Sequence, residues 1–131
     1  MNFLIDTNIL IYRLKNMGNV RDNFLNYKRE PMSISVVSYG VLVFGAKKSK
    51  AVEKNMETVL EIKKILPIIT VTPEIMDTFG EIKASTQKIG RIVDDMDLLI
   101  AATAITNDMI LVTHNTKHFE NIPNLMFTDW F

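Results

Sequence analysis

Short apolar runs alternate along the chain with longer segments in which apolar residues recur every three or four positions. A short continuous run fits a buried strand, whereas recurrence at three and four positions fits a helix with one apolar face. The pattern predicts helices at residues 8–15, 20–28, 39–47, 50–66, 73–89, 97–105 and 116–121. It predicts strands between them, at residues 3–5, 32–36, 68–71, 109–113 and 125–127.

Capping and turn residues support several of these boundaries. Pro67 ends the fourth predicted helix, because proline lacks the amide hydrogen that a helix interior needs. Thr72 followed by Pro73 is typical of a helix start. Ser38 is a candidate N-cap for the helix after the second strand. Trp130, close to the end of the chain, is expected to anchor the last strand.

The regular alternation of strands and helices predicts an α/β fold with a parallel sheet covered on both faces. The 131 residues, 47% of them hydrophobic, fit a single globular domain over residues 1–131, and no linker is visible. The longest apolar run, residues 98–105, is too short to cross a bilayer. No secretion signal opens the chain, so we expect a soluble cytoplasmic protein with no membrane partner.

The net charge and the cysteine content limit which binding partners and catalytic groups the chain can have. Fifteen basic and fifteen acidic residues give a net charge of zero, so a nucleic-acid partner would need a local basic patch. The absence of cysteine excludes disulfides, thiolate zinc sites and cysteine nucleophiles.

Two acidic residues lie at the ends of elements that are predicted to be buried. Asp6 follows the first strand, and Asp97 opens the most apolar helix. In a parallel sheet, sites form beyond the carboxyl ends of the strands, where residues 113–116 also lie. Burying an unpaired carboxylate is costly, whereas two carboxylates around a divalent cation satisfy one another and can support phosphodiester chemistry. A shared cation is therefore our leading hypothesis.

Each candidate also has an ordinary structural interpretation. Asp6 can cap the following helix, and Asp97 can complement a helix N-terminus for which Asp94 or Asp95 is the N-cap. Asn115 is more often a turn residue than a ligand. Such interpretations suffice for single residues, but they are weaker for two acids that converge on one sheet edge.

Hydroxyl and imidazole groups flank these acids. Thr7 and Thr113 are suited to orient a carboxylate or a metal-bound water, although ordinary helix and strand ends also use threonine. His114 and His118 are interpreted as surface residues, because no sequence spacing ties them to the carboxylates.

Several segments, taken in order, resemble the PIN-domain nucleases, and within them the VapC-type toxins of type II toxin–antitoxin systems. The resemblance covers nearly the whole chain, and the ordered set is more specific than any one piece. It rests on residues 3–12, residues 34–39 and 42–45, Gly90 with residues 97–102, residues 111–113 with Asn115 and Phe119, and Asp129 with Trp130.

This resemblance implies a PIN-like three-layer α/β/α fold with a mainly parallel sheet of about five strands. It implies an endoribonuclease toxin that depends on Mg²⁺, or on Mn²⁺, and that cleaves RNA to inhibit translation. Asp6, Asp97 and Asn115 would be catalytic, Asp6 and Asp97 would bind metal, and Thr7, Asp94 and Thr113 would assist. The implied partners are a VapB-like antitoxin, operator DNA only through the antitoxin complex, and a second copy in a homodimer.

One position departs from the family's pattern. An acidic residue is expected in the helix after the second strand, where this chain has Val41. Two carboxylates hold Mg²⁺ more weakly than three, so we expect Val41 to impair the activity. Asp94 could partly replace the missing acid through a water molecule.

A basic cluster formed by Lys47, Lys48 and Lys50, with Arg91 and Lys117, is a candidate for contacting an RNA backbone. A solvated charge run is an equally good interpretation.

Two other function classes compete. One is a catalytically inactive PIN-like protein that acts through antitoxin or RNA binding, which Val41 keeps open. The other is a nucleotide-binding α/β domain, which we reject because no glycine-rich loop follows the first strand.

Overall fold

Five parallel strands form the central sheet, in the order β3-β2-β1-β4-β5. The computed structural model describes all residues, 1–131. The strands are short and confirm the predicted parallel α/β architecture. They are β1 (Phe3–Ile5), β2 (Met32–Ser35), β3 (Ile68–Ile69), β4 (Ile110–Val112) and β5 (Phe127–Thr128).

Seven helices connect and cover the strands, as predicted, with ends shifted by a few residues. None of them is long and apolar enough to cross a membrane. The helices are α1 (Thr7–Leu14), α2 (Val20–Asn26), α3 (Val36–Lys47), α4 (Val52–Ile65), α5 (Pro73–Lys88), α6 (Asp95–Thr106) and α7 (Thr116–Phe119).

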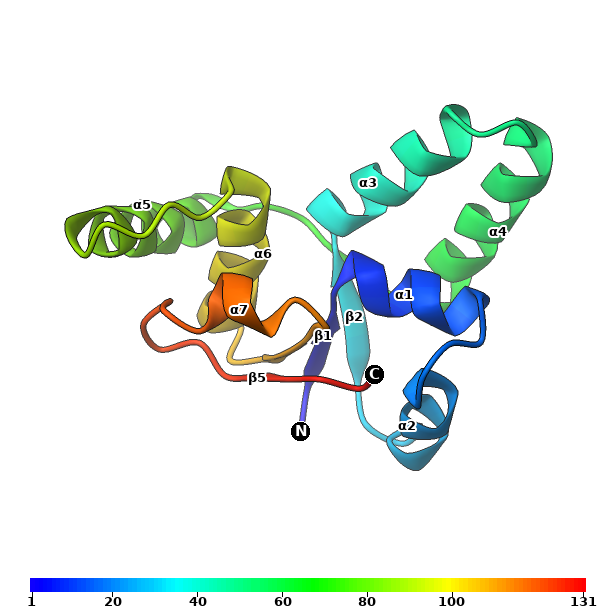
Figure 1. Ribbon diagram of the computed structural model, residues 1–131, viewed down its shortest axis with the longest axis horizontal. Coiled ribbons are helices and arrows are strands. Elements are labelled where there is room, and N and C mark those ends of the chain that lie inside the picture. The colour runs from blue at the N-terminus through cyan, green and yellow to red at the C-terminus, as the bar shows by residue number, and fades with distance from the viewer.

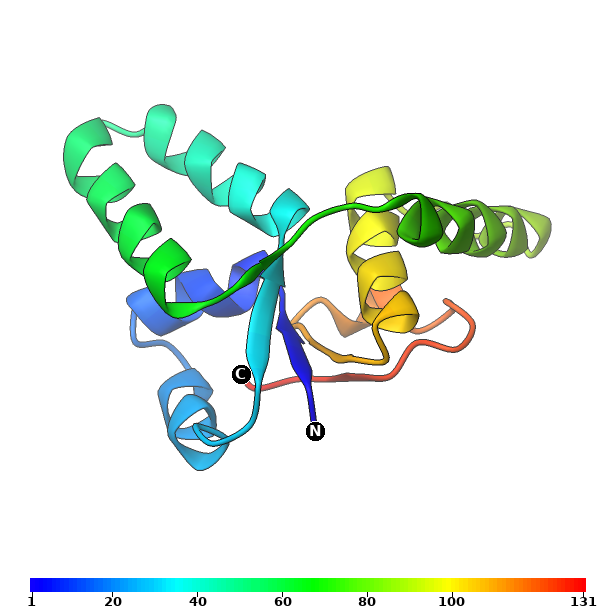
Figure 2. The ribbon, with the colours of Figure 1, turned by 180° about the vertical axis from the view of Figure 1, so that it is seen from behind.

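The sheet separates two hydrophobic cores. Helices α1 to α4 lie on one side of the strands and α5 to α7 on the other (Figure 1). Leu4 belongs to the core under α5 and α6, whereas its neighbours Phe3 and Ile5 belong to the core under α1 to α4. Alternate residues of a strand point to opposite faces, so the fully apolar strand β1 contributes to both cores. The segment that contains β3 crosses from α4 to α5 and joins the two layers (Figure 2).

The start of α3 corrects one prediction. Ser38 is not the N-cap. The helix begins directly at the end of β2, where Ser35 has an extended backbone and its Oγ accepts a hydrogen bond from the Val37 amide at 3.0 Å. Ser38 lies fully buried within the first turns, and its Oγ has no hydrogen-bond partner.

The C-terminal residues pack as predicted for Trp130. The indole is 3% exposed. It stacks on Tyr27 with ring centroids 5.3 Å apart and meets Phe3 and Phe24 edge-on at 5.0 and 5.2 Å. Asn23 Nδ2 donates to the Trp130 carbonyl at 3.0 Å. The tail after β5 is therefore anchored against α2 and β1.

Candidate functional site

Asp6 links β1 to α1 and is only 5% exposed. Its Oδ1 accepts a hydrogen bond from the Thr7 amide at 2.8 Å, so it is the N-cap of α1. Its Oδ2 accepts a second bond from Thr113 Oγ1, also at 2.8 Å. The capping interpretation is therefore correct but incomplete, because a second strand end also holds the carboxylate.

The segment after β4 is bound to the start of α1. Because β4 pairs with β1 in parallel, with Ile5 opposite Val112, Thr113 emerges beside Asp6. Thr113 Oγ1 also accepts from the Asn115 amide at 3.1 Å, and the His114 amide donates to Asn8 Oδ1 at 3.4 Å. These bonds bring the Asn115 backbone to the Asp6 edge of the sheet.

Asp97 lies in the first turn of α6 and is about one-fifth exposed at its side chain. Asp94 is the N-cap of this helix, and its Oδ2 accepts from the Met96 amide at 3.1 Å. His118 Nδ1 lies 3.2 Å from Asp97 Oδ2. His118 is exposed, as predicted for a surface residue. Its contact with Asp97 was not predicted, because no sequence spacing indicates that α7 carries His118 to α6.

Burial dominates the electrostatics of both acids. Removal from water raises the pKa of Asp6; the Thr113 and Thr7 hydrogen bonds oppose this rise, while the Asp97 charge adds to it. Burial likewise raises the pKa of Asp97, with His118 opposing. Asp6 makes no ion pair in the structure. A buried carboxylate next to another negative charge is stabilised by a cation.

The donor chemistry fits a hydrated divalent ion held by few protein ligands. Carboxylate oxygens are the ligands that Mg²⁺ and Mn²⁺ prefer. Each oxygen of Asp6 accepts one hydrogen bond and keeps a further acceptor site. No group of three or more His, Cys, Asp or Glu side chains is close enough to hold a metal. Asp97 is close enough for its charge to raise the pKa of Asp6, and joint binding of an ion by the two acids stays a prediction.

Val41 lines an apolar cleft of about 400 Å³ between α1, α3 and α4. Ile11, Leu14 and Ile62 also line it, whereas Asp6 and Asp97 do not. That a longer side chain at position 41 would reach the two acids stays a prediction.

The structure divides the predicted basic residues into two groups. Arg91 and Lys117 line one hollow together with Asp97 and His118. Lys47 and Lys48 lie at the far end of α3, a helix of 12 residues that is about 18 Å long. They are therefore a helix length away from the end of β2, where α3 begins.

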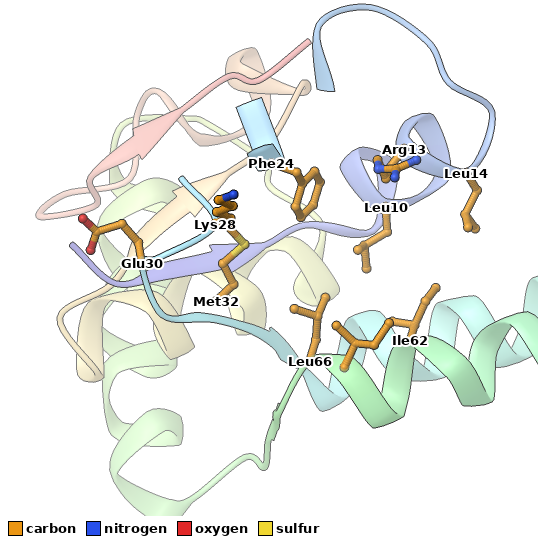
Figure 3. A pocket seen from close by; sticks show the side chains of 10 residues that line it. Leu10, Arg13, Leu14, Phe24, Lys28, Glu30, Met32, Ile62 and Leu66 are labelled. Carbon is orange, nitrogen blue, oxygen red and sulfur yellow. The ribbon is translucent and has the colours of Figure 1, made fainter. Parts of the chain in front are cut away.

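A groove of about 540 Å³ lies away from the acids. It lies between α1, α2, β2 and α4, and Leu10, Phe24 and Leu66 point toward the same space (Figure 3). Its charged lining residues are Arg13, Lys28 and Glu30. An exposed apolar groove with a charged rim is a typical protein-binding surface.

Comparison with known proteins identifies the family. The PIN domain model matches residues 3–125. The tRNA(fMet)-specific endonuclease VapC of Shigella flexneri is 33% identical over 131 residues, covering 99% of this chain and 98% of the relative. Ribonuclease VapC2 of Rickettsia felis is 33% identical over 132 residues with the same coverage. The chain belongs to the PIN-domain family, within the VapC ribonucleases.

Solved structures agree with this assignment. The VapBC2 complex of Rickettsia felis bound to a promoter DNA fragment contains a chain with a TM-score of 0.93 and 32% identity, at full coverage of both chains. The DNA-bound VapBC complex of Salmonella typhimurium matches with a TM-score of 0.92 and 30% identity over 100% of this chain and 99% of that chain. PIN-domain nucleases generally depend on a divalent metal, which fits the acid pair.

Proposed function

We propose that this PIN-domain protein is an endoribonuclease toxin that uses a divalent metal to cleave RNA and inhibit translation, and that Val41 impairs it. The observation that carries the proposal is the buried, unpaired carboxylate of Asp6 within electrostatic reach of Asp97 at the carboxyl ends of β1 and β4. Translation-related RNA is cytoplasmic, so we place the protein there.

Asp6 and Asp97 would hold the ion, and the hydrogen bonds from Thr7 and Thr113 would fix Asp6 in position. When bound, the ion would supply an activated water and offset the charge of the phosphate. Asp94 and Asn115 would contact bound water. All-oxygen carboxylate ligation favours Mg²⁺, with Mn²⁺ as an alternative.

The antitoxin partner is proposed from the relatives, whose complexes contain VapB with VapC. The apolar groove between α1, α2 and α4 offers a surface for an apolar antitoxin segment. Arg13 and Lys28, which outnumber Glu30 among its lining residues, would complement acidic neighbours of that segment. Operator DNA would be contacted only through the antitoxin complex.

A single domain over residues 1–131 would act as a homodimer. Phe44 on α3, 63% exposed, and Leu60 on α4, 44% exposed, remain uncovered on helices outside the acid site. Large exposed apolar side chains on neighbouring helices favour self-association.

The second candidate function is a catalytically inactive protein that acts through antitoxin or RNA binding. Val41 favours it, because an apolar side chain in an apolar cleft occupies the position of an expected ligand.

Purified variants on total RNA, with Mg²⁺, Mn²⁺ or EDTA, distinguish the two functions. The unaltered chain should cleave RNA slowly, and Val41→Glu should raise the rate by orders of magnitude and inhibit growth when expressed. Val41→Gln is the matched control, because it has nearly the same size without the charge. Adding Asp97→Asn to Val41→Glu should abolish cleavage.

Failure of a folded Val41→Glu chain to cleave RNA would refute the nuclease proposal and leave the binding function. Rapid cleavage by the unaltered chain would refute only the impairment, and would assign the third ligand to Asp94 or to water.

A further inference from the structure

A small hollow of about 210 Å³ opens beside Asp97. One wall is the loop between α5 and α6, and the other is α7 with the residues after it. The lining residues are Arg91, Ile92, Val93, Asp94, Asp97, Lys117, His118 and Asn121. The hollow is thus continuous with one of the two acids to which we assign catalysis.

Two cations line this hollow without an anionic partner. Arg91 and Lys117 are both exposed, and neither side chain makes an ion pair or a hydrogen bond within the chain. By contrast, Lys83 on the neighbouring helix pairs with Asp95 at 2.9 Å. Two free cations from separate segments, converging on one hollow, fit a ligand that carries more than one negative charge.

The same loop presents an apolar side chain to solvent. Ile92 is 98% exposed, the highest value among the exposed large hydrophobic residues. It lines the hollow at Asp97 and also a second hollow of about 270 Å³ that includes Arg91 and Gln87. An apolar group between two polar hollows suits a strand with alternating phosphates and bases, because a base has an apolar face.

We propose that this hollow binds single-stranded RNA next to the scissile phosphate, with Arg91 and Lys117 contacting backbone phosphates and Ile92 packing against a base. The proposal rests on the proposed ribonuclease function and assigns its substrate contacts. It also explains how an acidic site receives a polyanion, because the two cations line the same hollow as Asp97.

Binding of a fluorescently labelled single-stranded RNA, measured by anisotropy in EDTA over a range of salt concentrations, tests the phosphate contacts. Each phosphate contact contributes about 0.7 to the salt-dependence slope for single strands. Arg91→Gln with Lys117→Gln should therefore lower the slope by about 1.4 and weaken binding about tenfold or more at low salt. Lys47→Gln with Lys48→Gln removes the same charge at the far end of α3 and should change the slope little.

The base contact has its own test in the Val41→Glu background. Ile92→Ser should leave the salt slope unchanged but weaken binding several-fold and alter the choice of cleavage sites on a defined RNA. Ile89→Ser is the matched control, because Ile89 is 61% exposed and lines neither hollow. Thermal melting should confirm that all variants fold.

The two proposals fail separately. Equal losses in the two double variants, or no RNA binding by a chain whose Val41→Glu form cleaves RNA, would overturn the hollow as a substrate site and leave the nuclease function intact. A Val41→Glu chain that does not cleave, but binds RNA through Arg91 and Lys117, would overturn the catalytic function and keep the RNA site.

Discussion

Thr113 Oγ1 lies 2.8 Å from Asp6 Oδ2, although 107 residues separate the two in sequence. The bond is buried and joins the ends of two neighbouring parallel strands. It gives a desolvated carboxylate one of its two donors within the chain, the other being the Thr7 amide. The hydroxyl therefore offsets part of the cost of keeping an acid at this position.

Replacing Thr113 with valine should destabilise the protein. The isosteric change leaves the buried Asp6 oxygen without this donor, at a cost of about 1–3 kcal/mol. It should also raise the pKa of Asp6 further, because the Thr113 bond opposes the effect of burial. Urea unfolding at pH 7 in EDTA measures the change. Thr113→Ser keeps the hydroxyl and should cost much less, and equal stability of the valine variant and the unaltered chain would contradict the prediction.

Asp97→Asn should stabilise the metal-free protein at neutral pH. Burial raises the pKa of Asp97 above its ordinary value of 3.8, so the folded chain holds this proton more tightly than the unfolded chain. The folding free energy then becomes less favourable as the pH rises from 3.8 through the folded-state pKa. Asparagine has no such titration.

Unfolding in EDTA between pH 3 and pH 7, at roughly one-unit steps, measures this linkage. The advantage of Asp97→Asn should be smallest below the ordinary aspartate pKa and should grow toward pH 7. A constant difference across the range would show that Asp97 is not perturbed. Saturating Mn²⁺ should reverse the order at pH 7, because the ion stabilises only the chain that binds it.

Charge in the apolar groove should weaken antitoxin binding. Ile65 on α4 lines the groove and is 74% exposed, so glutamate there should cost little stability but oppose an apolar partner. A central interface residue contributes about 2 kcal/mol or more, which corresponds to roughly thirtyfold in affinity. Calorimetric titration with the VapB-like antitoxin checks this. Met76→Glu, on α5 and outside the groove, should bind almost normally, and equal loss in both variants would exclude the groove.

The sequence predicted those parts of the site that parallel topology determines. Asp6 and residues 113–115 follow neighbouring strands, so their convergence needs only the strand order. Thr72 and Asp94 were recognised as caps because a capping side chain acts on amides two or three residues away, as both do here. Such local rules do not depend on how the layers pack.

Other features depend on tertiary packing and carried no local signal. Ser35 and Ser38 are equally good caps by composition, and only the end of β2 selects Ser35. His118 reaches Asp97 because α7 packs against α6, across 21 residues with no motif between them. The convergence of Arg91 and Lys117 likewise arises from packing, because the loop after α5 and helix α7 line one hollow.

Gly18→Ala should destabilise the fold, because Gly18 packs against the C-terminal residue Phe131. Gly18 has φ of +60°, and an added Cβ would lie 2.6 Å from the Phe131 carbonyl oxygen. Both the left-handed backbone and the contact with backbone oppose a side chain, so the cost should exceed about 1 kcal/mol. Gly40→Ala is the matched control. Its Cβ would meet nothing within 4 Å in the helix, so it should stabilise by about 0.5–1 kcal/mol. Urea unfolding of the two variants should therefore give shifts of opposite sign.

Val41→Glu should lower the stability of the metal-free protein and raise its affinity for a divalent metal ion. Val41 is half-buried beside Ile11 and Leu14, so a carboxylate there should cost about 1–3 kcal/mol in EDTA. If the new carboxylate joins Asp6 and Asp97, a divalent ion gains a third anionic ligand and binds more tightly. Metal should then restore the lost stability, by about 2.7 kcal/mol when its concentration is a hundred times the Kd.

Thermal unfolding with and without Mn²⁺ separates this effect from general stabilisation by salt. The rise in Tm should be larger for Val41→Glu than for the unaltered chain, no larger for Val41→Gln than for the unaltered chain, and abolished when Asp97→Asn is added to Val41→Glu. Because the Gln variant introduces the same bulk into the same cleft, it reports the steric cost alone. An equal rise in Tm for the Glu and Gln variants would mean that position 41 does not face the acids, and that the loss of a ligand at Val41 does not account for any weak activity of this chain.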